Sequence, residues 1–132
     1  MDILAYTACL GLIILMGGQP ERVGALIITA GSLATAAVAV TTWQHLELSV
    51  LVVDILVLTA LWAVALTSNR FWPYWVTAWQ LIAVLVHLQM VFFSNIMPAA
   101  YSYSSKYLAF PMVLLMLLAS VQIRLRLLER SA

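Results

Sequence analysis

Four polar side chains stand at regular spacing inside two apolar stretches of the sequence. Glu47 and Asp54 are seven residues apart in one stretch, and Gln80 and His87 are seven residues apart in the next. Residues at this spacing lie on nearly the same face of a helix, and at 1.5 Å per residue they differ in depth by about 10 Å. If the two stretches form adjacent antiparallel helices, Asp54 and His87 come to a similar depth and face each other.

Such a pair has a clear chemical rationale. A carboxylate in hydrocarbon costs about 2.5–3.5 kcal/mol on insertion scales, so it needs a partner or a use. Histidine titrates near neutral pH, so an Asp54–His87 pair could exchange a proton, with Glu47 toward the outer surface and Gln80 on the inner side. The pair could also be a structural contact between helices. A third possibility is a site for a partner subunit, a lipid or a quinone headgroup.

Other chemistries lack the required residues or spacing. His45 and His87 could ligate a b-type haem only at equal depth, and the predicted depths differ by about 10 Å. The sequence has no histidine–glutamate zinc pair, nucleophile elbow or phosphate-binding glycine loop. We therefore expect no enzyme and no metal site. No cofactor is required, although a quinone, pigment or haem contact stays open.

The composition is that of a membrane protein. The chain has 132 residues, of which 65% are hydrophobic and 8% are charged, and its mean hydropathy is +1.07. Soluble domains carry about 25% charged residues, so this chain has too few polar groups to cover a water-facing surface. The formal net charge of +1 gives no reason to expect a nucleic-acid partner.

The apolar segments predict an all-α transmembrane bundle that forms a single domain over residues 1–132. A spanning helix needs about 20 apolar residues, with a range of about 17–25. We predict five spans, at residues 3–18, 23–43, 46–67, 73–96 and 107–125, with a polar loop at 99–106. The first segment is close to the lower limit, so the alternative is four spans plus a re-entrant or cleaved first segment. Asp2 stands where a signal peptide carries a basic residue, which favours a retained helix.

Five spans would bring all the arginines to one side of the membrane, namely Arg22, Arg70, Arg124, Arg126 and Arg130. The positive-inside rule then predicts a cytoplasmic C-terminus and an outside N-terminus. The basic tail that carries Arg124, Arg126 and Arg130 is expected to lie at the cytoplasmic headgroups or to dock on an acidic partner.

The second segment carries a series of small residues. Gly31, Thr35 and Ala39 are spaced by four, which lets helix backbones approach closely. We expect this face to lie at the centre of the bundle or at an interface with a partner.

The sequence from Ser68 to Gln80, SNRFWPYWVTAWQ, is followed by His87. This pattern resembles a family of small membrane proteins of alphaproteobacteria, sphingomonads in particular, that has no established activity. The resemblance covers residues 68–87 and implies a location in the bacterial inner membrane. Small multidrug transporters are a poorer match, because they carry a glutamate in the first helix and residues 3–18 contain none.

The leading functional hypothesis is a non-enzymatic subunit or accessory protein of a larger inner-membrane complex, with the lipid bilayer and other membrane subunits as partners. The alternative is a small oligomeric proton-linked transporter or channel that uses Asp54 and His87.

Overall fold

The computed structural model describes the backbone of residues 3–41, 46–92 and 98–131, and the side chains of 4–38, 48–89, 92 and 110–131. Every regular element in these ranges is an α-helix. The helices are α1 (Ile3–Met16), α2 (Gln19–Thr41), α3 (Leu46–Thr67), α4 (Trp72–Phe92) and α5 (Pro98–Ser131). The predicted all-α class is therefore confirmed, and the chain forms a helical bundle.

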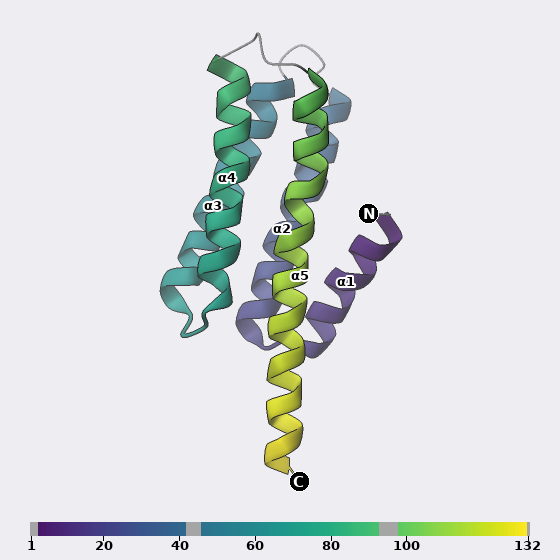
Figure 1. The fold of residues 1–132 in the computed structure, drawn as a ribbon, viewed down its shortest axis with the longest axis vertical. Coiled ribbons are helices and arrows are strands. Elements are labelled where there is room, and N and C mark those ends of the chain that lie inside the picture. Colours follow the sequence, from purple (N-terminus) through teal and green to yellow (C-terminus); the bar gives the residue numbers. More distant parts are fainter. Residues whose placement is uncertain (1–2, 42–45, 93–97, 132) are drawn as a thin grey trace.

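Successive helices run in opposite directions (Figure 1). In that view α2 and α4 rise while α1, α3 and α5 descend, so the α1–α2 turn and the α3–α4 turn lie at the same end of the bundle. α3 packs mainly on α2 and α4, and α5 packs mainly on α4 and α1. Arg22 lies in the first turn of α2, Arg70 lies in the α3–α4 turn, and α5 carries its arginines past the same end. We call this the arginine end.

A close turn joins α1 to α2. The Gly17 N–H donates to the Ile13 carbonyl at 2.8 Å, and the Arg22 Nε donates to the Ile14 carbonyl at 2.9 Å. Both bonds satisfy carbonyls that the end of a helix leaves without partners. α2 begins at Gln19, earlier than the predicted start at Val23. The reason is that Pro20 is well tolerated in a first helical turn, where it lacks only an unneeded N–H.

The predicted loop at residues 99–106 is helical instead. α5 begins at Pro98, not near Tyr107, and continues to Ser131, beyond the predicted end at 125. Proline suits the start of a helix, so Pro98 begins α5 rather than merely ending α4. Pro111 consequently lies inside α5, where it removes one backbone hydrogen bond.

All five helices contribute to one apolar core. Its fully buried members include Ile13 of α1, Leu61 of α3, Val76 of α4 and Met116 of α5, and Ile28 of α2 packs with them. Because α1 supplies both Leu10 and Ile13, loss of α1 would expose this core.

Three helices are long and apolar enough to cross a membrane, judged by length and composition over the described residues. The candidate spans are Gln19–Val38, Leu48–Thr67 and Phe110–Ser131. Only 22% to 28% of the residues in these windows are buried inside the bundle. The outward surface is therefore mostly apolar, as expected for contact with lipid.

The other two helices are not among the candidates. α1 has 14 residues and is about 21 Å long at 1.5 Å per residue, and its N-terminal end reaches only part of the way up the bundle in Figure 1. α4 carries Gln80, His87 and an aromatic first turn.

Three threonine hydroxyls on the helices are satisfied locally, whereas the buried Thr77 Oγ1 has no hydrogen-bond partner among the described residues. Thr29, Thr59 and Thr67 donate to carbonyls four residues earlier, at 2.7 to 2.8 Å. This back-bonding lets a hydroxyl face lipid without an unmet hydrogen bond. One hydroxyl pair joins two helices, because Tyr6 Oη lies 3.0 Å from Ser32 Oγ and so ties α1 to α2.

Candidate functional site

The face of α4 that packs into the bundle carries three of its polar residues. Thr77, Gln80 and His87 are all buried, and so is Val84 on the same face. The outward face of α4 is mostly apolar, with Leu81 and Leu85 exposed, although Gln89 is exposed as well. A helix adopts such an arrangement when its outer face meets lipid and most of its polar groups lie within the protein.

Asp54 of α3 meets that polar face. His87 Nε2 lies 3.0 Å from Asp54 Oδ2, and Gln80 Nε2 donates to Asp54 Oδ1 at 3.1 Å. Gln80 Nε2 also lies 3.3 Å from the Asp54 backbone carbonyl. The sequence prediction that Asp54 faces His87 is confirmed, and Gln80 completes the group. We call these three residues the polar clamp.

The clamp is compact and mostly enclosed. The side chains of His87 and Asp54 are 9% and 17% exposed. Each carboxylate oxygen of Asp54 has a nitrogen partner from α4, so both oxygens have a polar contact within the bundle. Glu47 lies one heptad earlier on α3, but its side chain is outside the described residues. Two titratable groups in contact can hold helices together or pass a proton, and the geometry is compatible with both.

The small-residue face of α2 is used within the chain at Gly31. A Cβ added to Gly31 would come 2.5 Å from Val57 Cγ2, so the absence of a side chain lets α2 approach α3. Thr35 is half-buried farther along the same helix. The side chain of Ala39 is outside the described residues.

The end of α5 extends beyond the rest of the bundle (Figure 1). Arg124, Arg126 and Arg130 are exposed there. Three leucines of the same segment are more than half exposed, namely Leu125, Leu127 and Leu128. The tail thus presents both cations and apolar side chains that this chain itself does not cover.

A second buried polar contact lies at the arginine end. Glu21 is fully buried, and its Oε1 accepts a hydrogen bond of 2.7 Å from Trp72 Nε1. This bond joins the first turn of α2 to the first turn of α4. Glu21 Oε2 has no hydrogen-bond partner among the described residues.

Small residues make room for this contact. A Cβ on Gly18 would lie 2.9 Å from Glu21 Oε2, and one on Gly24 would lie 2.7 Å from Trp72 Cη2. Sequence reasoning missed the pair because an acidic residue after a proline is ordinary at the start of a helix. A tryptophan before a proline also suggests only an interfacial anchor. The adjacent Gly17 and Gly18, with Gly24 one turn beyond Pro20, were the available signal of close packing.

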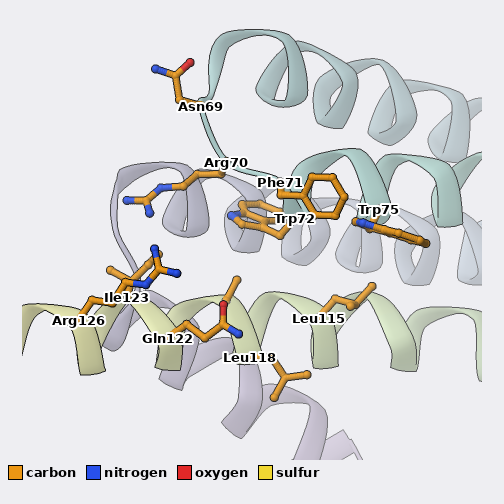
Figure 2. A pocket seen from close by; sticks show the side chains of 11 residues that line it. Asn69, Arg70, Phe71, Trp72, Trp75, Leu115, Leu118, Gln122, Ile123 and Arg126 are labelled. Atoms are coloured by element: carbon orange, nitrogen blue, oxygen red, sulfur yellow. The ribbon is translucent and has the colours of Figure 1, made fainter.

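A groove lies beside this contact, between the start of α4 and the middle of α5 (Figure 2). Its volume is about 590 Å³. Figure 2 shows the side chains of Arg70 and Arg126 at one end of the groove and those of Trp75 and Leu115 toward the other. Trp72 and Leu118 also line it. We call it the arginine groove.

Comparison of the chain with protein-family models, curated proteins and solved structures finds no match. Within the described residues, no three His, Cys, Asp or Glu side chains are grouped so that they could hold a metal ion.

Proposed function

We propose that the protein is a non-enzymatic accessory subunit of a larger bacterial inner-membrane complex. The observation that carries this proposal is the projecting end of α5. A helix that extends beyond its bundle with three arginines, three leucines and only one glutamate, Glu129, exposed is suited to dock on an acidic, partly apolar partner surface. The resemblance of residues 68–87 to small alphaproteobacterial membrane proteins supports the location.

We further propose that the chain crosses the membrane five times with the arginine end in the cytoplasm. The alternating direction of the helices supports this, because it brings every arginine to one end. α1 is the shortest of the five, so a spanning α1 requires local thinning of the bilayer, whereas a re-entrant α1 would leave four spans.

Affinity purification tests the subunit proposal. The tagged chain is extracted from an alphaproteobacterial host in mild detergent and compared with the variant Arg124→Gln/Leu128→Ser/Arg130→Gln. Arg126 is left intact so that the arginine groove is not disturbed. We expect a partner of fixed stoichiometry with the wild-type chain and its loss in the variant, at equal yield and helicity. Purification of the wild-type chain alone in several detergents would reject the proposal.

The polar clamp favours a second candidate, a small proton-linked transporter or channel. Asp54 and His87 are two titratable groups in contact within the apolar part of the bundle. The variant Asp54→Asn, reconstituted in liposomes with a pH-sensitive dye, tests this function. Proton flux in the wild type that falls to the level of empty liposomes in the variant would support it. Equal flux in both proteins would exclude a role for the clamp in transport.

A further inference from the structure

The arginine groove has a cationic end and a largely apolar wall. One end carries two guanidinium groups, and the remainder is formed mostly by aromatic and aliphatic side chains, with the amides of Asn69 and Gln122 among them. The volume of about 590 Å³ is within the range of small-molecule sites, about 300–1,000 Å³. A ligand that fits must therefore be an amphiphile with an anionic end.

The two cations come from separate parts of the fold. Arg70 belongs to the α3–α4 turn, and Arg126 lies on α5. Neither guanidinium has an ion-pair partner among the described residues. Two like charges that line one opening repel each other, and an anion between them turns this repulsion into attraction. Guanidinium groups bind phosphate through paired N–H donors, which makes them well suited to a phosphate ester.

The wall of the groove is fixed in place. The Trp72 ring is 7% exposed, and its Nε1 donates to Glu21 Oε1 at 2.7 Å. Glu21 itself does not line the groove. Its carboxyl group therefore holds Trp72 from outside the groove, and the charged side chains that line the groove are the two arginines. Leu115 and Leu118 continue along α5 from the arginines toward the apolar part of the bundle. An acyl chain could follow these leucines.

The position of the arginine groove along the bundle agrees with an amphiphilic ligand that has an anionic end. Phe71, Trp72 and Trp75 all lie at the arginine end of the bundle, and aromatic side chains of this kind sit at headgroup depth. We propose that the arginine groove binds an anionic phospholipid, with its phosphate between Arg70 and Arg126 and the start of its acyl chain against Leu115 and Leu118. The inference rests on the membrane location and is independent of the partner that the tail would bind.

Native mass spectrometry of the full chain in neutral detergent tests this site. The protein is titrated with dioleoylphosphatidylglycerol and, separately, with dioleoylphosphatidylcholine, which has the same acyl chains but no net charge. We expect a single phosphatidylglycerol to bind about tenfold more tightly than phosphatidylcholine. In Arg70→Gln/Arg126→Gln this preference should disappear, because both phosphate-binding groups are gone.

A matched variant controls for charge alone. Arg124→Gln/Arg130→Gln removes two cations from the same end but outside the groove, and its preference should stay within about twofold of the wild type. Equal losses in the two double variants would mean that net charge, not the groove, attracts the lipid, and the proposal would be overturned. Equal affinity of the wild type for the two lipids would overturn it as well.

A groove-filling variant and a competition with inorganic phosphate complete the test. Leu118→Trp fills the groove without a change in charge and should also weaken phosphatidylglycerol binding, so it decides the matter if the arginine variant fails to fold. Inorganic phosphate is added as a competitor. If it displaces phosphatidylglycerol at comparable concentration, the site takes a free anion rather than a lipid, and the assignment is wrong.

Discussion

His87 Nε2 lies 3.0 Å from Asp54 Oδ2, and this contact joins α3 to α4 within the apolar part of the bundle. With Gln80 it gives each oxygen of the carboxylate a partner. A buried carboxyl group with a partner on each oxygen costs far less than an isolated one, although the pair need not contribute much to stability overall. Its strength can be measured directly.

A double-mutant cycle on Asp54→Ala and His87→Ala should give a favourable coupling free energy. Polar contacts in membrane proteins average about 0.6 kcal/mol and reach about 1.7 kcal/mol, and we expect a value in the upper half of this range because both groups can be charged. Reversible unfolding in mixed micelles measures it. Asp54→Ala combined with Thr59→Ala is the control, since Thr59 bonds only the Ile55 carbonyl of its own helix. A coupling of zero for Asp54 and His87 would contradict the clamp.

Two glycines should respond in opposite ways to a methyl group. Gly31→Ala places a Cβ 2.5 Å from Val57 Cγ2, and valine in a helix has little freedom to rotate away. We expect a loss of about 1–2 kcal/mol in the free energy of unfolding, since overpacking outweighs the gain in helix propensity. Gly11→Ala meets no atom within 4 Å and should be neutral or stabilising by up to about 1 kcal/mol.

The variant Val57→Ala in the Gly31→Ala background tests the cause. Removal of the two methyl groups that the new Cβ would meet should recover part of the lost stability. If Gly31→Ala and Gly11→Ala behave alike, α2 and α3 are not in close contact at Gly31.

The sequence alone predicted the parts of this fold that depend on local pattern. Hydrophobic runs predicted five helices, and the seven-residue spacing on α3 and α4 predicted the Asp54–His87 contact, because antiparallel neighbours with short turns have few ways to pack. It failed at Pro98 and residues 99–106, where Ser and Tyr residues suggested a loop although none of them prevents a helix. The contact between Glu21 and Trp72 was also missed. It joins residues 51 positions apart, and no periodicity within one helix reveals such a pairing.

Trp72 and Trp75 should differ sharply in their contribution to stability. Trp72→Phe removes the N–H that Glu21 accepts and leaves a fully buried carboxyl group without this bond. We expect a loss of about 1–3 kcal/mol in the free energy of unfolding. Trp75 is 55% exposed, and Trp75→Phe should cost less than about 0.5 kcal/mol. Thermal unfolding followed by circular dichroism gives both values. Glu21→Gln keeps an acceptor for Trp72 and should fall between them, so a loss as large as that of Trp72→Phe would mean that the second oxygen of Glu21 also has an essential partner.

Accessibility of single cysteines should reveal one membrane face at the arginine end. In a Cys9→Ser background, Asn69→Cys in the α3–α4 turn and Ser131→Cys at the end of α5 should both escape a membrane-impermeant maleimide in intact cells. Both should react in inverted vesicles, because the arginines hold that end in the cytoplasm. Lys106→Cys, which the five-span prediction puts on the outer side, should show the reverse. Reaction of Asn69→Cys and Ser131→Cys from opposite sides would mean that α4 and α5 do not both cross the bilayer. Reaction of both from outside, with Lys106→Cys reacting only in inverted vesicles, would keep α4 and α5 as spans and invert their orientation, which would put the arginine groove in the outer leaflet.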